Sequence, residues 1–221
     1  MTTSRAPVVG LIGGIGSGKS ALARWVAGQR NVRILDADSA GHRALQNEAV
    51  RQRLCERFGE EILDETGVVS RPQLAAIVFG ITPEHRQHRE TLEQIVHPVI
   101  REDIRAQLQQ AAADPAVELI LLDAALLLEA GWNELCDAVV FVDTPRTIRQ
   151  QRVQSNRNWS EDELQRREAN QRSVTEKRAA ADAVVDNSRS IEVAGGQFLE
   201  WFERQFRAPD CGRNQAGLAP A

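Results

Sequence analysis

One pattern near the start of the chain, Gly13 to Ser20, most constrains what this protein can fold into. It reads Gly-Gly-Ile-Gly-Ser-Gly-Lys-Ser and fits the phosphate-binding pattern G-x-x-x-x-G-K-[ST] in full. An apolar run, Val8 to Ile12, precedes it, and the stretch Ser20 to Ala27 after it has helical composition. A buried strand, a glycine-rich turn and a helix are the context that phosphate binding requires. The alternative, a glycine-rich turn with an incidental Lys-Ser pair, does not explain that context.

The predicted loop supplies the groups that hold a triphosphate. Glycines let the backbone turn tightly, so that successive N–H groups converge on phosphate oxygens, and the following helix adds the positive end of its dipole. Lys19 would bring a mobile charge to the β- and γ-phosphates of ATP, and the Ser20 hydroxyl would bind Mg²⁺. The expected nucleotide contacts are Gly14, Ile15, Gly16, Ser17, Gly18, Lys19, Ser20 and Ala21.

Short apolar runs separated by helical segments predict a parallel α/β sheet with helices on both faces. Five runs have this character. They are Val8–Ile12, Val32–Leu35, Val117–Leu122, Ala138–Val142 and Ala183–Val185. The expected fold class is therefore α/β, the three-layer α/β/α arrangement of a P-loop NTPase with a five-stranded parallel sheet.

Two long stretches interrupt this alternation of strand and helix. Residues 48–113 contain no convincing strand, and their helical segments are broken at three glycines and at Pro98, which predicts a helical insertion. Residues 147–178 are strongly charged and helical, with a break before Ser160, which forms a capping-box pattern with Glu163. This second stretch is the candidate for a helical lid.

We expect one unit over residues 1–206, with a core that the insertion and the lid interrupt. The core would comprise about residues 1–47, 114–146 and 179–206. The tail, residues 207–221, is rich in Pro, Gly and Ala without periodicity, and it is predicted to be disordered.

Charge and cysteine content limit the classes of partner. A net charge of −4 argues against a protein that holds nucleic acid by its overall charge. The cysteines lie far apart without C-x-x-C spacing, which is typical of free thiols in a reducing cytosol. No apolar stretch has the length of a membrane span, and the polar N-terminus does not resemble a signal peptide. The expectation is a cytoplasmic monomer or weak homo-oligomer with no nucleic-acid or membrane partner.

Carboxylates follow two of the predicted strands. Asp36 and Asp38 follow the run Val32–Leu35, and Asp123 follows a later, strongly apolar run. The carboxyl ends of parallel strands face the ligand crevice. Asp38 is therefore the candidate base for a hydroxyl proton, and Asp123 is the candidate that positions Mg²⁺. Asp36 is expected to cap the helix beginning near Ser39, and a capping role for the other two stays open.

The charged stretch offers arginines for a lid that would exclude water from the reaction. Arg152 and Arg157 are the best placed to neutralise charge developing on a transferred phosphoryl group, and the sequence does not separate them. A solvated helical face accounts for at least half of the basic residues in the stretch. These are Arg149, Arg152, Arg157, Arg166, Arg167, Arg172, Lys177 and Arg178.

Nucleotide binding alone leaves open a small-molecule kinase, a switch GTPase and an ATPase motor. The chain lacks the Asn-Lys-x-Asp element of a guanine-specific GTPase, and it lacks the Leu-Ser-Gly-Gly-Gln-like signature of a transport ATPase. A kinase needs a base, an acceptor site and a basic lid, and the chain has a candidate for each. The pattern therefore favours a kinase that uses ATP and Mg²⁺.

Over about residues 8–190, the chain resembles the dephospho-coenzyme A kinase family. The double glycine followed by Ile-Gly-Ser-Gly-Lys-Ser, the Asp-Ala-Asp element and a later His-Pro form a specific combination. In order, the matching residues are Gly13 to Ser20, Asp36-Ala37-Asp38, Arg71, Leu74, His97-Pro98, Asp123, Leu126-Leu127, Glu129, Arg152, Gln171, Lys177, Ala181-Asp182 and Asn187.

The resemblance implies transfer of the ATP γ-phosphate to the ribose 3′-hydroxyl of dephospho-coenzyme A, the last step of coenzyme A biosynthesis. It implies a nucleoside monophosphate kinase-like fold with a helical acceptor-binding domain and a helical lid. In this family Asp38 aligns with the general base and Arg152 with the lid arginine, so the implied catalytic residues are Asp38, Lys19 and Arg152. The resemblance adds Asn187 to the nucleotide contacts, and the implied acceptor-binding residues are Asp38, Arg71 and His97. A role for His97 in fixing a helix break stays open.

The chain also departs from the family pattern. Ala125 stands where the family usually has Pro, and Leu128 stands where an aromatic residue is common. The spacing between Arg152 and Arg157 is one residue longer than the family's, so the assignment of Arg157 stays open. Two rival functions remain: a kinase acting on a nucleoside monophosphate, gluconate or shikimate, and a P-loop binding protein without transferase activity.

Overall fold

A single parallel sheet of five strands forms the centre of the protein in the computed structural model, which describes residues 5–80 and 82–207. The strand order is β2-β3-β1-β4-β5, so the strand before the glycine-rich loop is central. The strands are β1 (Val8–Ile12), β2 (Val32–Asp36), β3 (Leu119–Asp123), β4 (Ala138–Asp143) and β5 (Ala183–Asp186). The predicted fold class and all five predicted strands are confirmed.

Alternation along the strands divides the core into two clusters. In β1, Val8 and Ile12 belong to one buried cluster, and Val9 and Leu11 belong to the other. Because successive side chains of a strand point to opposite faces, a continuous apolar run needs cover on both sides. Helices provide that cover and so complete the three layers.

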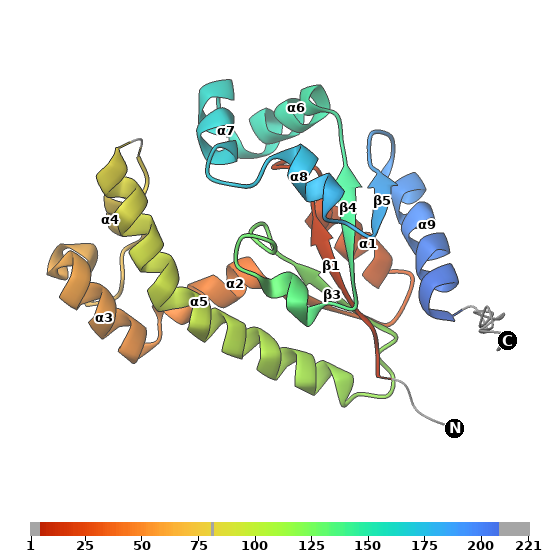
Figure 1. Cartoon of the computed structure of the whole chain (residues 1–221), viewed down its shortest axis with the longest axis horizontal. Coiled ribbons are helices and arrows are strands. Elements are labelled where there is room, and N and C mark those ends of the chain that lie inside the picture. Colours follow the sequence, from red (N-terminus) through yellow and green to blue (C-terminus); the bar gives the residue numbers. More distant parts are fainter. Residues whose placement is uncertain (1–4, 81, 208–221) are drawn as a thin grey trace, which may run out of the picture.

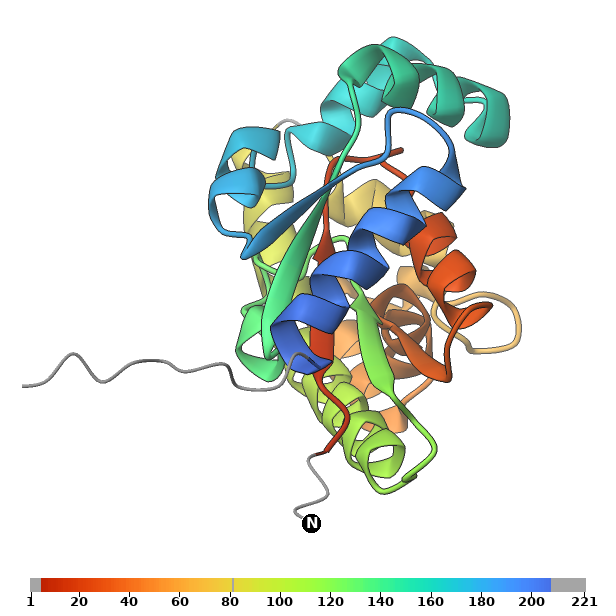
Figure 2. The ribbon, with the colours of Figure 1, turned by 90° about the vertical axis from the view of Figure 1, so that its right-hand side faces the viewer.

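Helices α1 (Lys19–Ala27) and α9 (Ile191–Phe202) cover one face of the sheet, and α2 (Ala37–Leu45) and α5 (Pro83–Ala112) cover the other (Figures 1 and 2). The remaining α-helices are α3 (Glu48–Phe58), α4 (Arg71–Val78), α6 (Arg146–Arg157), α7 (Glu161–Glu168) and α8 (Val174–Ala179). Short helical turns are η1 (Glu60–Ile62), η2 (Trp132–Leu135) and η3 (Glu203–Arg207).

The predicted insertion consists of α3, α4 and the long helix α5, which extends from the core to α4 (Figure 1). The predicted break at Pro98 is wrong, because α5 continues through that residue. Proline removes one hydrogen bond of the helix ladder. Here Ile95, Val96, Ile100 and Ile104 on both sides of the proline are buried, and their packing keeps the helix continuous.

The predicted lid contains α6, α7 and most of α8, of which α6 and α7 lie above the sheet in Figure 1. Helix α6 ends at Arg157 and is capped by Asn158, the one non-glycine residue with positive φ in the described chain. Ser160 caps α7 by accepting a hydrogen bond from the Glu163 N–H. The Glu163 carboxylate instead pairs with arginines, so the predicted capping box is only half formed. A complete capping box, Ser173 with Glu176, begins α8.

Three smaller expectations concern the tail, the cysteines and the membrane. Of the tail predicted to be disordered, Arg207 ends the helical turn η3 and pairs with Glu118, and residues 208–221 lie outside the described residues. Cys55 and Cys136 are free thiols, and Cys211 lies outside the described residues. Within the described chain no helix has the length and apolar character needed to cross a membrane.

Two adjacent glycines of α9 provide a test of how α9 packs on α1. A Cβ added to Gly195 would overlap the ring of Trp25, whereas a Cβ on Gly196 would meet nothing within 4 Å. We expect Gly195→Ala to lower the free energy of unfolding by about 1–3 kcal/mol because the interface is overpacked. Gly196→Ala is expected to raise it by about 0.5–1 kcal/mol because alanine favours the helix. Urea unfolding of both variants measures the difference, and equal effects would contradict this packing.

Candidate active site

The glycine-rich loop connects β1 to α1 at the carboxyl edge of the sheet. Gly16 and Gly18 have φ values of 78° and 91°, which side chains of L-residues rarely adopt. A Cβ on Gly18 would also overlap the amide of Asn187, and one on Gly14 would lie 2.7 Å from Arg149 Nη1. The loop therefore has a compact backbone that only glycine permits at these positions, as the phosphate-binding pattern predicts.

Hydrogen bonds to the carbonyl of Ser17 hold this loop against the neighbouring segments. It accepts hydrogen bonds from Thr144 Oγ1 at 2.9 Å, Asn187 Nδ2 at 2.7 Å and Arg152 Nη1 at 3.3 Å. Arg152 also donates to the Asn187 carbonyl at 3.1 Å. Of the residues that contact the loop here, Asn187 and Arg152 were predicted from the sequence as site residues. Thr144 was not predicted. A direct contact of Asn187 with nucleotide stays a prediction.

Lys19 begins α1 and its ammonium lies 3.4 Å from the Gly13 carbonyl. Burial lowers the pKa of Lys19 from 10.5 to about 8, an effect that the charges of Asp123 and Asp38 partly offset. The same pattern of interactions shows that the lysine shares one electrostatic environment with both carboxylates. The next residue, Ser20, lies exposed in the first turn of the helix.

The predicted carboxylates meet at the ends of β2 and β3, where Asp36 pairs in register with Asp123. Asp36 caps α2, because its carboxylate accepts hydrogen bonds from the N–H groups of Asp38 and Ser39 at 2.9 and 3.2 Å. Loss of hydration, followed by repulsion from Asp36 and Asp123, raises the pKa of Asp38, and Lys19 partly offsets this effect. The structure therefore brings Asp38, Asp123 and Lys19 together and assigns the cap to Asp36, as predicted.

The two candidate lid arginines have different surroundings. Arg152 is engaged with the carbonyls below the loop, as described above. Arg157 lies within electrostatic range of Lys19, whose pKa it helps to lower. Its guanidinium lies 5.0 Å from the ring centroid of Trp159, and Arg167 lies 4.0 Å from the same centroid. The ring thus orients Arg157 through a cation–π contact.

Arg149 is a buried arginine of the charged stretch for which the sequence predicted no individual role. It donates to the Ile15 carbonyl at 3.1 Å and to the Thr144 carbonyl at 3.2 Å, and it pairs with Glu168 at the end of α7. Its side chain is only 6% exposed. Arg149 therefore connects the phosphate loop to helix α7 of the predicted lid, and its position within a charged helix did not indicate this contact.

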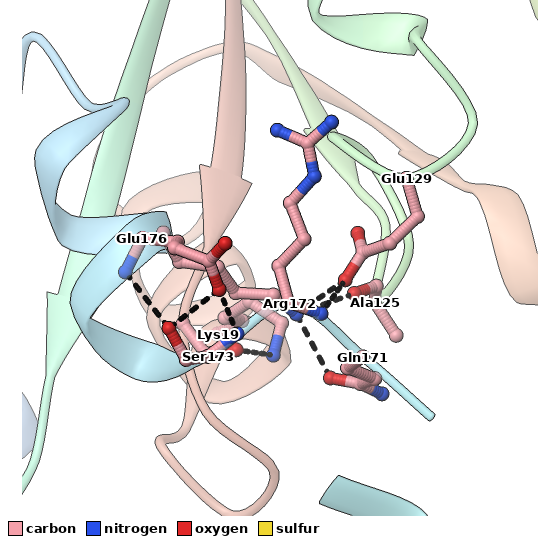
Figure 3. A network of polar contacts seen from close by, with 9 residues as sticks. Lys19, Ala125, Glu129, Gln171, Arg172, Ser173 and Glu176 are labelled. Atoms are coloured by element: carbon pink, nitrogen blue, oxygen red, sulfur yellow. Dashed lines mark hydrogen bonds and ion pairs between the residues drawn. The ribbon is translucent and has the colours of Figure 1, made fainter. Parts of the chain in front are cut away.

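A second buried cation, Lys177, binds the loop after β3, and its partners Ala125, Glu129 and Gln171 are labelled in Figure 3. Its ammonium donates to the Ala125 carbonyl at 3.1 Å and to Gln171 Oε1 at 2.8 Å, and it lies 3.2 Å from Glu129 Oε1. The family resemblance marked three of these four residues. The departure at Ala125 leaves the network intact because only a backbone carbonyl is used there, and the other departure, Leu128, lies in the core.

Removing the Lys177 ammonium tests this network. We expect Lys177→Ala to lower the free energy of unfolding by about 3 kcal/mol, because Glu129 and the Ala125 carbonyl lose their buried partner. Arg178→Ala is the matched control, since it breaks the more exposed Arg178–Asp143 pair and should cost at most about 1 kcal/mol. Urea unfolding measures both, and a Lys177→Ala variant as stable as the control would contradict the assigned network.

The predicted acceptor residues lie on the helical insertion. Arg71 begins α4 and is exposed, and it makes no hydrogen bond or ion pair with the described residues. His97 lies on α5, in edge contact with Trp132 at 5.6 Å between ring centroids, and burial lowers the pKa of its imidazole. His97 and Trp132 line a cavity of about 620 Å³. The contacts of the structure do not join Arg71 or His97 to Asp38.

A phosphate loop, a lysine shared with two carboxylates and the arginine-rich helices α6 and α7 define the class of this protein as a P-loop kinase. The model of the family described as "Dephospho-CoA kinase" matches residues 7–192, so the chain belongs to the dephospho-CoA kinase family.

Individual relatives agree with this assignment. The chain is 37% identical to a dephospho-CoA kinase of Corynebacterium diphtheriae over 198 residues, which cover 89% of this chain and 96% of that protein. It is 34% identical to a dephospho-CoA kinase of Dehalococcoides mccartyi over 185 residues, covering 84% and 90%. The crystal structure of TT1252 from Thermus thermophilus is similar with a TM-score of 0.76 and 28% identity, covering 91% of this chain and 99% of that one.

Proposed function

We propose that this protein phosphorylates the ribose 3′-hydroxyl of dephospho-CoA with ATP, giving CoA and ADP in the last step of CoA biosynthesis. The family assignment supports the substrate. The observation that carries the chemistry is the convergence of Lys19, Asp38 and Asp123 beside the phosphate loop. A P-loop protein that only binds nucleotide would not require this arrangement of base and cation site.

The residues present fit ATP with a magnesium ion. The glycines of the loop adopt backbone angles that leave no space for a side chain, so the backbone N–H groups can approach phosphate oxygens. Lys19 adds a positive charge beside the loop. Ser20 and Asp123 would hold Mg²⁺, whose ligands in proteins are oxygen atoms. When bound, the ion neutralises charge on the phosphates.

Asp38 would accept the proton of the acceptor hydroxyl during transfer. Its raised pKa makes its carboxylate a stronger base than that of an ordinary aspartate. Lys19 would orient the β- and γ-phosphates, and Arg152 would hold the loop in the form that binds them. Arg157 would add positive charge from the lid side.

The acceptor would lie between the core and the helical insertion, with Arg71 and His97 as its proposed contacts there. In this proposal residues 48–113 form the acceptor domain, residues 147–178 form the lid, and the rest of residues 1–206 forms the core. We place the enzyme in the cytoplasm, as a monomer or weak homo-oligomer.

The direct test is ADP release with ATP, Mg²⁺ and dephospho-CoA, with the acceptor omitted as control and the product identified by mass. Acceptor-dependent ADP together with CoA would support the proposal. ATP binding without acceptor-dependent ADP would overturn the substrate assignment. Competition with a nucleoside monophosphate, gluconate and shikimate would then test the rival kinases.

A further inference from the structure

A cavity of about 450 Å³ separates the phosphate loop from the lid and is the starting point for the inference. Charged side chains from α6, α7, α8 and the turn between α7 and α8 line it together with the loop backbone. The lining residues that matter here are Gly14, Ile15, Arg149, Glu168, Arg172 and Lys177. Because Gly14 and Ile15 belong to the phosphate loop, the cavity adjoins the place where phosphate groups are expected.

Two of the three cations around this cavity are already neutralised. Arg149 pairs with Glu168 and donates to two carbonyls. Lys177 is paired with Glu129 and donates to Gln171 as well. A cation satisfied in this way holds protein groups in place and has little capacity left for a ligand anion.

Arg172 differs from both. Its guanidinium forms no hydrogen bond or ion pair with the described residues, and Figure 3 shows it extending away from the network below. Its charge acts on Glu176, whose pKa is lowered mainly by the Ser173 hydroxyl and least by Arg172. The Glu176 carboxylate is occupied by the capping box of α8.

The backbone that carries Arg172 is nevertheless fixed. Its own N–H donates to Glu129 Oε1 at 2.8 Å, the preceding Gln171 binds Lys177, and the following Ser173 caps α8. The free guanidinium therefore starts from a defined position at the cavity, which is how proteins present a group for a ligand.

We infer that Arg172 binds phosphate oxygens of the acceptor substrate. The inference rests on the proposed function and names a contact of that same site. The position of Arg172 favours the acceptor over ATP in two ways. Its backbone is bound to Glu129, in the loop that follows β3 and Asp123, and the neighbouring Asn170 accepts a hydrogen bond from Arg89 of α5. The second contact joins this segment to α5 of the helical insertion, and Trp132, which follows Glu129, also contacts His97 of α5. The pyrophosphate of dephospho-CoA matches the planar fork of an arginine.

Steady-state kinetics with each substrate varied in turn test the inference. We expect Arg172→Ala to raise the KM for dephospho-CoA roughly tenfold or more and to leave the KM for ATP within about twofold. Arg172→Lys keeps the charge without the fork and should lie between the alanine variant and the wild type. Arg166→Ala is the matched control, since it removes the same charge from a 65% exposed arginine of the lid and should change neither KM.

Each other outcome overturns the assignment. If Arg172→Ala raised only the KM for ATP, Arg172 would bind the nucleotide and not the acceptor. If neither KM changed, Arg172 would have no role in substrate binding. An equal rise in the KM for dephospho-CoA in Arg166→Ala would show that the positive charge attracts the substrate in general and that Arg172 makes no specific contact. Failure of the wild type to phosphorylate dephospho-CoA would instead overturn the proposed function, so the two failures are distinguishable. Calorimetric binding of dephospho-CoA without ATP gives a second readout that does not depend on turnover.

Discussion

Replacing Asp38 by Asn is expected to lower kcat by about 10²–10⁴-fold while the affinity for ATP stays nearly unchanged. Asparagine keeps the shape of the side chain but cannot accept the hydroxyl proton. ATP binding should persist because the loop, Lys19 and Asp123 remain in place. Single-turnover kinetics measure the chemical step, and a fluorescent ATP analogue measures binding.

The neighbouring carboxylate supplies the matched control. Asp36 caps α2 through the N–H groups of Asp38 and Ser39, and asparagine caps helices equally well, so Asp36→Asn should retain most of the activity. It should also change the pH profile. Repulsion from Asp36 raises the pKa of Asp38, so removing that charge should move the acid limb of kcat/KM to lower pH.

Two outcomes would contradict this assignment. Wild-type turnover in Asp38→Asn would remove Asp38 from the chemistry. A loss in Asp36→Asn as large as that in Asp38→Asn would show that the α2 terminus matters as a structure, and that no single carboxylate acts as the base.

The parts of the site that the sequence predicts are those determined by local chemistry. Gly16 and Gly18 have backbone angles that few residues other than glycine adopt, so the glycines of the sequence pattern directly predict the conformation of the loop. Asp36 is recognisable as a cap because capping depends on a residue two or three positions away. The sheet is predictable for a similar reason, since buried parallel strands are continuous apolar runs.

The parts that could not be predicted depend on residues distant in sequence. Arg149 and Lys177 lie in a charged stretch where most side chains face solvent, and only the fold places Glu168, Ile15 and Ala125 beside them. The break predicted at Pro98 was wrong for a related reason. Packing of α5 on the core outweighs the local tendency of proline to end a helix, and that packing cannot be read from the local sequence. The sequence did not distinguish Arg152 from Arg157 as the lid arginine. Their different contacts depend on how the helices of the predicted lid are arranged.

Replacing Lys19 by Met is expected to weaken ATP binding by at least about tenfold and to lower kcat by a further 10²–10³-fold or so. The lysine belongs to the phosphate-binding pattern itself, and methionine retains most of its length without its charge. Arg24→Met is the matched control, since it removes one positive charge from the exposed face of the same helix and should bind ATP normally. Equal losses in the two variants would contradict a specific contact with phosphate.

The lowered pKa of Lys19 makes this prediction sharper. In the free protein burial holds the pKa near 8, and bound phosphates would raise it because opposite charges favour the ammonium form. At pH 8 the wild type should therefore take up about half a proton when ATP binds, whereas at pH 6.5 the lysine is already charged and uptake by Lys19 should vanish. Calorimetry in two buffers with different heats of ionisation measures the difference, and Lys19→Met should remove it.

The same pKa predicts a stability change of the opposite sign. A folded-state pKa below the ordinary value of 10.5 means that the charged lysine disfavours the folded state at pH 7, and that this cost disappears as pH rises from about 8 toward 10.5. Methionine carries no charge to desolvate, so Lys19→Met should unfold with about 1–3 kcal/mol more free energy at pH 7 than the wild type without ligand. Urea unfolding without nucleotide measures this gain, and a destabilised variant would contradict it. A variant that is more stable yet inactive would show that the site maintains Lys19 for phosphate binding at a cost to folding.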